Sequence, residues 1–225
     1  MKKVLCVVTS NNVKGSTGIP TGFWFSELTH PMAKLEEAGF ETVLASIKGG
    51  EPPMDKDGFD LTDAINKKYW EDEAFQQKLK HTLALGDANP ADYAAIFFAG
   101  GHGVMWDFPD SEAVQRVTRD IYEQGGIVSA VCHGPAALVN VKLTDGSYLV
   151  AGKNVTGFTN GEEAEVQATD IVPFLLESKL NEHGAKHHPA ANWANNVVVD
   201  GRLVTGQNPA SAAGVGEALV KLLKA

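Results

Sequence analysis

A cysteine and a histidine stand side by side in the segment AVCHGPAAL, residues 130–138. The apolar run 127–131 precedes Cys132, and small residues follow His133. This order is typical of a nucleophile elbow, a tight strand-to-helix turn that presents a nucleophile at the carboxyl edge of a parallel sheet. We therefore predict that Cys132 is a nucleophile, and that the N-terminus of a following helix lowers the pKa of its thiol.

A second apolar run ends in glycines, in the segment AAIFFAGGHG at residues 94–103. Glycines after a buried strand allow backbone N–H groups to face the crevice, as an oxyanion hole requires, although a GGxG segment alone is equally typical of a plain turn. We expect the N–H groups of Gly101 and His133 to form this hole. The substrate pocket is expected to include Gly100, His102, Trp24 and Trp106.

A nucleophilic thiol needs a proton acceptor, and the acceptor needs a group that orients it. His133 is the candidate acceptor. The candidate carboxylates are Glu27, Glu162, Glu163 and Glu165. Glu27 stands among aromatic residues, so we predict that its carboxyl group is desolvated, protonated and hydrogen-bonded to the Cys132 sulfur.

The remaining cysteine and histidines give weaker signals. Cys6 lies in an apolar run, where a free cysteine usually acts as a small hydrophobic residue. His187 and His188 are adjacent, but no second pair of ligands at metal spacing accompanies them. The sequence therefore predicts neither a metal nor an organic cofactor.

The composition excludes several classes of partner. The chain has 225 residues, 44% of them hydrophobic and 21% charged, with a formal net charge of -9. The negative charge disfavours nucleic acids and anionic membrane surfaces, and no apolar stretch approaches a membrane span. The N-terminal apolar run 4–8 is shorter than a signal-peptide core, and the two cysteines form no disulfide pattern. We expect a cytoplasmic protein.

Apolar runs alternate with amphipathic segments along the chain, which predicts an α/β fold with right-handed crossovers. An Asp-Gly pair between two short apolar runs predicts a β-hairpin near residue 200. The predicted strands are 4–8, 42–45, 94–98, 127–131, 154–156, 196–199 and 202–205, and the predicted helices are 28–38, 111–124 and 210–223, with a further helix starting in 161–166.

The stretch 48–92 is too long for a simple crossover between strands. Its start, GGEPPMDKDG, is rich in turn residues, and residues 71–85 predict an amphipathic helix. We interpret residues 1–225 as a single domain in which 48–92 forms a small inserted cap. A surface insertion without a function is the alternative.

Several segments together resemble a known family. GGHGVMWDFPD, AVCHGPAAL, VTGFTNGEE and LVTGQNPASA, with FWFSELTHP at 23–31 and PPMD at 52–55, are similar to the PfpI-like superfamily, which has a class I glutamine amidotransferase-like fold. Within it they resemble the branch of Hsp31-type chaperones and glutathione-independent glyoxalases (glyoxalase III), relatives of the Parkinsonism-associated deglycase. The resemblance spans nearly the whole chain.

The resemblance implies a flavodoxin-like three-layer sandwich with a mostly parallel sheet, and a homodimer. It places a Cys-His-Glu triad on Cys132, His133 and Glu163, with Glu162 as the alternative acid, and a further acid beside the sulfur on Glu27. It implies a cofactor-free lyase of the glyoxalase III (D-lactate dehydratase) type, which converts the 2-oxoaldehyde methylglyoxal to lactate through a cysteine hemithioacetal.

Other functions remain as alternatives. The same family includes protein deglycases and stress-response chaperones, so glycated or unfolded proteins are further candidate partners, and a stress-inducible holdase is the main alternative. A class I glutamine amidotransferase takes its histidine and glutamate from a late His-x-Glu segment, and no such segment occurs here. Nothing in the sequence specifies the peptide pocket of a cysteine peptidase.

Overall fold

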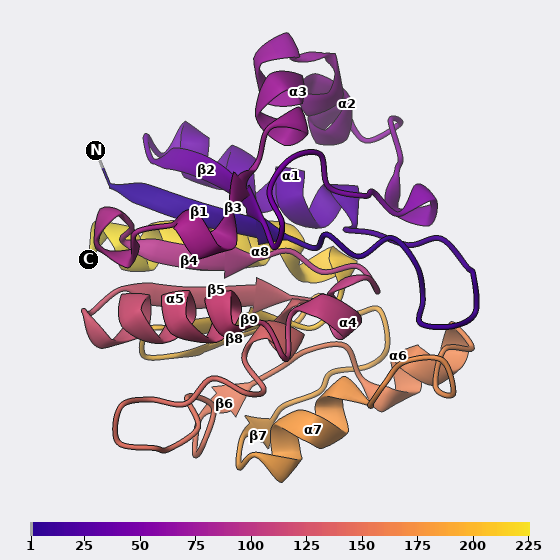
Figure 1. The fold of residues 1–225 in the computed structure, drawn as a ribbon, viewed down its shortest axis with the longest axis vertical. Helices are drawn as coiled ribbons and strands as arrows, with labels where there is room; N and C mark the ends of the chain where they lie inside the picture. Colours follow the sequence, from indigo (N-terminus) through magenta and orange to yellow (C-terminus); the bar gives the residue numbers. More distant parts are fainter. Residues whose placement is uncertain (1) are drawn as a thin grey trace.

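The fold is organised around a seven-stranded sheet, seen in a computed structural model that describes residues 2–225 (Figure 1). The strand order is β3-β2-β1-β4-β5-β9-β8. The strands are β1 (Lys3–Val8), β2 (Glu41–Ser46), β3 (Leu83–Ala84), β4 (Ala95–Phe98), β5 (Ile127–Val131), β8 (Val197–Asp200) and β9 (Leu203–Gly206). All neighbouring pairs are parallel except β8 and β9, which form the predicted hairpin.

Helices cover the sheet, which explains why its central strands read as continuous apolar runs. Helices α1 (Phe25–Glu37) and α8 (Ala212–Lys224) pack against each other, and α5 (Glu112–Glu123) packs against β4 and β5 (Figure 1). Every residue of β4 and β5 is buried. Cys6 is fully buried in β1, as its apolar surroundings predict. The predicted α/β class is confirmed.

The inserted stretch differs from the sequence prediction. The single helix expected over 71–85 is wrong: the structure has α2 (Ala64–Glu71), α3 (Glu73–Lys80) and then strand β3. Asp72 causes the break, because it adopts an extended conformation and its carboxylate accepts a hydrogen bond from the N–H of Ala74. Leu83 and Ala84 then pair with β2, so the stretch also supplies one edge of the sheet.

Aromatic rings of α2 and α3 pack against α1 and so connect residues 48–92 to the main fold. Phe25 of α1 lies 6.0 Å from Trp70 and 6.2 Å from Phe75, measured between ring centroids. The backbone around residues 53–55 also pairs with Phe23, at the start of the segment that leads into α1. Residues 48–92 therefore support the entry to α1, and a role for them as a cap stays a prediction.

A smaller group of strands and helices lies below the main sheet in Figure 1. Strands β6 (Asn154–Val155) and β7 (Lys186–His187) form a two-stranded parallel sheet, accompanied by α6 (Asn160–Glu165) and α7 (Leu176–Glu182). The short helix α4 (Val104–Asp107) follows the glycines after β4. Within residues 2–225, none of the helices combines the length and apolar character that a membrane crossing demands.

Candidate active site

Cys132 follows β5 in a strained turn. Its φ is 61°, in the left-handed region that residues other than glycine seldom adopt, and its N–H donates a 2.9 Å hydrogen bond to Gly206 O. Gly134 allows the turn to close, because a Cβ at this position would lie 2.4 Å from Phe98 O. The backbone has the geometry of a nucleophile elbow.

The environment of the thiol differs from the prediction in one respect. No α-helix starts directly after Cys132. A short 3₁₀ turn over Gly134–Ala137 follows it instead. The side chain is buried, and burial raises the pKa of the Cys132 thiol; Glu27 adds to this increase at pH values where its own carboxyl group is ionised. The predicted lowering of the thiol pKa by a helix N-terminus is therefore wrong.

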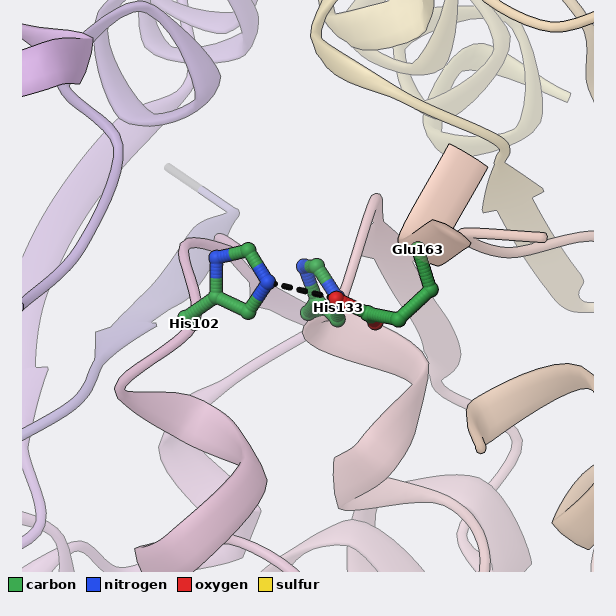
Figure 2. A group of neighbouring side chains, drawn as sticks. All are labelled: His102, His133 and Glu163. Carbon is green, nitrogen blue, oxygen red and sulfur yellow. Dashed lines mark hydrogen bonds and ion pairs between the residues drawn. The ribbon is translucent and has the colours of Figure 1, made fainter. Parts of the chain in front are cut away.

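The structure brings His133, Glu163 and His102 together (Figure 2), and His133 lies next to the Cys132 thiol. Nδ1 of His133 lies 3.6 Å from Cys132 Sγ, and its Nε2 lies 2.6 Å from Glu163 Oε2. The other oxygen of the same carboxylate lies 2.7 Å from His102 Nε2. Both imidazoles thus direct Nε2 at one carboxylate, which comes from α6.

The charges in this cluster follow from burial and from these contacts. Burial alone raises the pKa of Glu163, but the charge and hydrogen bonds of the two histidines outweigh it and hold the pKa below its usual range. Burial lowers the pKa of His102 to about 4, assisted by the charge of His133 and opposed by Glu163. At neutral pH, Glu163 is therefore ionised and His102 is neutral, with each histidine Nε2–H donated to the carboxylate.

Glu162, the alternative acid, has a different environment although it is the next residue back along the chain. Its Oε1 accepts hydrogen bonds from the backbone N–H of Trp193 and from the side-chain amides of Gln207 and Asn208, at 2.8–3.0 Å. Its Oε2 accepts from the N–H of Thr159, whose hydroxyl caps α6 in return. Glu162 therefore joins three loops and does not contact His133. Glu165, the third candidate on this helix, bonds to Asn192 and Trp193 instead.

Glu27 lies close to the Cys132 thiol and comes from α1, whereas Glu163 comes from α6. It is fully buried, and its Oε2 accepts a 2.8 Å hydrogen bond from the Gly100 N–H. Its Oε1 has no hydrogen-bond partner, and the carboxyl group as a whole influences the Cys132 thiol through their proximity. Burial raises the pKa of Glu27 to about 8, so the carboxyl group is protonated at neutral pH.

The glycines after β4 pack tightly against this group. A Cβ on Gly100 would lie 2.4 Å from Glu27 Oε2, and Gly101, at φ 98°, passes close to the backbone of Gly22. The N–H of His133 is directed at the Cys132 sulfur. The N–H of Gly101 has no backbone or side-chain acceptor within residues 2–225. Two amides are thereby available near the sulfur for an oxygen that gains negative charge.

A cavity of about 340 Å³ opens over the thiol, and its walls are mostly apolar. It is lined by Trp24, Gly101, His102, Cys132, His133, Phe158, Val166, Trp193, Asn208, Pro209 and Ala210. Of the four predicted pocket residues, Trp24 and His102 lie in this lining. Gly100 and Trp106 are not in this lining: Gly100 lies against the Glu27 carboxyl, and the indole of Trp106 lies next to Gly15.

Sequence reasoning missed part of this wall. Phe158, Trp193 and Asn208 come from three separate loops that meet only in the folded chain; Asn208 follows β9 of the main sheet. Phe158 stacks at 4.2 Å from the His133 ring. The segments VTGFTNGEE and LVTGQNPASA contained two of these residues, but Trp193 lies in a stretch without any motif.

A larger cavity of about 640 Å³ lies at the opposite, amino-terminal edge of the sheet, next to Lys2 and Arg202. The guanidinium of Arg202 is already bonded to the carbonyl oxygens of Tyr122 and Gly126, and no nucleophile or acid–base pair accompanies it. The chemically competent groups lie at the other cavity, so we place the site there despite its smaller volume.

One group of side chains has the composition of a metal site. The ligand atoms of His102, His133 and Glu163 lie within 4.8 Å of one another. A bound cation would have to displace the two hydrogen bonds that now satisfy Glu163, and the imidazole needed beside the sulfur would become a ligand. The cluster is therefore best explained as a hydrogen-bonded acid–base group.

Known proteins share this architecture. The family model described as the DJ-1/PfpI family matches residues 18–222. The chain belongs to the DJ-1/PfpI family. Among curated relatives, Glyoxalase 3 of Candida albicans is 34% identical, and the match covers 98% of this chain and 98% of that protein. Glutathione-independent glyoxalase HSP31 of Saccharomyces cerevisiae is 37% identical over 94% of this chain and 93% of its own.

Solved structures extend the similarity to three dimensions. Rapid Encystment Protein 24 kDa of Francisella tularensis superimposes with a TM-score of 0.96 at 43% identity, covering 99% of both chains. Glyoxalase III of Candida albicans superimposes with a TM-score of 0.90 at 33% identity, covering 98% of this chain and 97% of that one. The family fold therefore extends over the whole sheet and the candidate site.

Proposed function

We propose that the protein is a glutathione-independent glyoxalase, a lyase that converts a small 2-oxoaldehyde such as methylglyoxal into a 2-hydroxy acid. One observation carries the proposal: the Cys132 sulfur lies 3.6 Å from His133 Nδ1, whose Nε2 lies 2.6 Å from the ionised Glu163. This triad opens into an apolar cavity. The names of the relatives from Candida albicans and Saccharomyces cerevisiae support the same reaction class.

The first step is addition of the thiol to the aldehyde carbon, C1. As the bond from sulfur to C1 forms, His133 Nδ1 takes the thiol proton, and Glu163 stabilises the resulting imidazolium. The former aldehyde oxygen, O1, gains negative charge within reach of the Gly101 and His133 N–H groups. His133 then protonates O1, which gives a neutral hemithioacetal.

The later steps move hydrogen and add water. A proton passes from C1 to the neighbouring carbon, C2, through an enediol, and O1 becomes the carbonyl oxygen of a thioester. Water, deprotonated by His133, attacks this thioester and releases the 2-hydroxy acid with the free thiol. Every step uses groups of this chain and water.

Replacement of the nucleophile tests the proposal. We expect the native protein to form lactate from methylglyoxal without glutathione, and Cys132→Ala to lose at least about 10³-fold of kcat, because no covalent adduct can form. Cys6→Ala is the matched control, since Cys6 lies in the core away from the cavity. Lactate formation by Cys132→Ala at the native rate would refute the mechanism.

Two finer statements belong to the same proposal. We infer that the protein acts as a homodimer, as the resemblance of its sequence implies, and in the cytoplasm, as its composition predicts. Action on glycated proteins and action as a holdase are secondary candidates. Within residues 2–225, five large hydrophobic side chains are exposed, and two of them, Val166 and Trp193, line the cavity.

A further inference from the structure

We propose that Trp193 is a specificity-determining residue, and that the site prefers 2-oxoaldehydes whose carbon C2 bears an uncharged apolar group larger than methyl, such as phenylglyoxal. The proposal rests on the proposed glyoxalase function and names its substrate class. It follows from an aromatic wall that leads away from the thiol, from the composition of the cavity lining and from the way in which Trp193 is held.

The aromatic wall runs from the triad to the mouth of the cavity. The ring of His133, whose Nδ1 lies 3.6 Å from the Cys132 sulfur, packs 4.2 Å from the ring of Phe158, measured between centroids. Phe158 in turn meets the indole of Trp193 at 5.7 Å, and all four residues line the cavity. A carbon bonded to the sulfur therefore lies at one end of this wall, and a substituent that extends along the wall reaches Trp193.

The cavity offers more apolar space than a methyl group can use. Its volume of about 340 Å³ falls at the lower end of the ~300–1,000 Å³ typical of sites that enclose drug-sized ligands. The side-chain amide of Asn208, which also lines the cavity, already donates to Glu162 Oε1 and to Ala194 O. Most of the remaining wall is carbon, which gains free energy by burying a larger apolar substituent.

The same lining disfavours charged and sugar-like substituents. No lysine or arginine lines the cavity within residues 2–225, and Lys14, whose positive charge lowers the pKa of His102, lies outside the lining. The carboxylates of Glu163 and Glu165 lie beside the site. A phosphate or carboxylate on the substrate would lose its water without gaining a cation, and a chain of hydroxyl groups would find few partners.

Helix α6 holds Trp193 in an unusual conformation. Its φ is 64°, in a region that residues other than glycine seldom adopt, and 44% of the residue is exposed. Glu162 Oε1 accepts a hydrogen bond from its backbone N–H, and Glu165 Oε2 accepts one from its indole N–H. The chain thus retains a strained backbone to present an apolar ring that the core does not enclose, which is typical of a ligand-binding position.

A comparison of substrates tests the proposal through kcat/KM for 2-hydroxy acid formation without glutathione. For the native protein, kcat/KM should be at least about tenfold higher for phenylglyoxal than for methylglyoxal, since one methylene in an apolar pocket already changes it by about tenfold or more. It should be lowest for 3-deoxyglucosone, whose substituent carries hydroxyl groups.

The variant Trp193→Gly removes the indole without adding strain, because glycine adopts a φ of 64° freely. Its kcat/KM should fall at least about tenfold more for phenylglyoxal than for glyoxal, which has a hydrogen in place of the substituent. The inherent reactivity of each aldehyde is the same in both proteins and cancels in this ratio. Val199→Ala is the matched control and should leave the ratio unchanged, because it removes an exposed apolar side chain of β8, outside the cavity.

Alkylation of Cys132 gives a second readout that needs no turnover. Phenacyl chloride and chloroacetone carry the same phenyl and methyl groups on a carbonyl, and the sulfur of either adduct bonds to the CH₂ carbon as chloride leaves. Relative to their rates with 2-mercaptoethanol, native Cys132 should prefer phenacyl chloride by at least about tenfold. Trp193→Gly should lose most of this preference.

The outcomes separate the specificity from the reaction. Equal losses of kcat/KM for glyoxal and phenylglyoxal in a folded Trp193→Gly would overturn the proposal, and so would a native preference for methylglyoxal or 3-deoxyglucosone over phenylglyoxal. If no aldehyde yields a 2-hydroxy acid while Cys132 keeps a Trp193-dependent preference for phenacyl chloride, the proposed function fails and the apolar subsite stands.

Discussion

Two buried carboxyl groups of the candidate site, Glu27 of α1 and Glu163 of α6, are in opposite charge states. In α1, Glu27 is protonated because burial raises its pKa to about 8, and the Gly100 N–H and the neighbouring Cys132 thiol offset this only in part. On the α6 side, Glu163 is also buried, yet it is ionised because two imidazoles donate to it. Burial is common to both, so the partners determine the charge.

This asymmetry gives each side of the site its own task. A neutral carboxyl group beside the sulfur keeps a second negative charge away from the forming thiolate. An ionised carboxylate behind His133 favours the imidazolium that appears when the thiol loses its proton. An ionised Glu27 would disfavour the thiolate, and a neutral Glu163 would disfavour the imidazolium. Substitutions that change the charge of either carboxyl group therefore test this difference.

The largest effect is expected from Glu163→Gln. The amide cannot accept hydrogen bonds from both imidazoles, and it offers no charge to an imidazolium, so kcat should fall by about 10³–10⁴-fold, as in other triads that lose their acid. The measurement is steady-state lactate formation, with thiol alkylation by iodoacetamide as a parallel assay. A variant that retains native kcat would show that Glu163 does not assist His133.

Glu27→Gln tests the other side, with a smaller effect on turnover of about 10²-fold. Its clearest signature lies in stability. The native pKa of about 8 exceeds the ordinary value of 4.5, so the folded state holds this proton more tightly than the unfolded state. The resulting stabilisation is complete below pH 4.5 and is lost as the pH rises to about 8.

Chemical unfolding across this range provides the measurement. Relative to Glu27→Gln, the native protein should lose up to about 5 kcal/mol of unfolding free energy between pH 4.5 and pH 8. The thiol of the variant should titrate at lower pH, because the charge of Glu27 is gone. Parallel stability curves for the two proteins would contradict a raised pKa at Glu27.

Local patterns were sufficient to predict much of the fold. Apolar runs such as 127–131 become buried parallel strands because helices cover both faces, and an Asp-Gly pair at 200–201 marks the hairpin. The inserted stretch was harder, since Asp72 divides one amphipathic pattern into two helices. The two-residue strand β3 depends on pairing with β2, and no local sequence pattern predicts this pairing.

The candidate site, like the fold, could be predicted from the sequence only in part. The nucleophile and its histidine are adjacent, so the sequence places them together, whereas Glu162 and Glu163 are adjacent and equivalent in pattern. Only the direction in which α6 turns each side chain separates them. The thiol pKa was misjudged because a motif shows the turn but not the burial, and burial is the dominant cause.

The smallest effect on turnover is expected from Glu162→Gln, which makes the comparison sharper because the neighbour of Glu163 is changed in the same way. A side-chain amide can still accept from Gln207 and Asn208 through its oxygen, but its NH₂ group then faces the N–H of Thr159. We expect a loss of about 1–3 kcal/mol in unfolding free energy, the cost of an unsatisfied buried polar group, and a decrease in kcat of tenfold or less, roughly, since His133 is untouched.

Unfolding curves and kinetics of Glu162→Gln and Glu163→Gln, measured side by side, separate the two roles. Glu162→Gln should lose mainly stability, and Glu163→Gln mainly turnover. If both variants lost kcat to the same extent while remaining folded, the effect would follow from the negative charge of α6 as a whole. The specific contact between Glu163 and the two imidazoles would then no longer explain why one carboxylate in this site is ionised and the other is not.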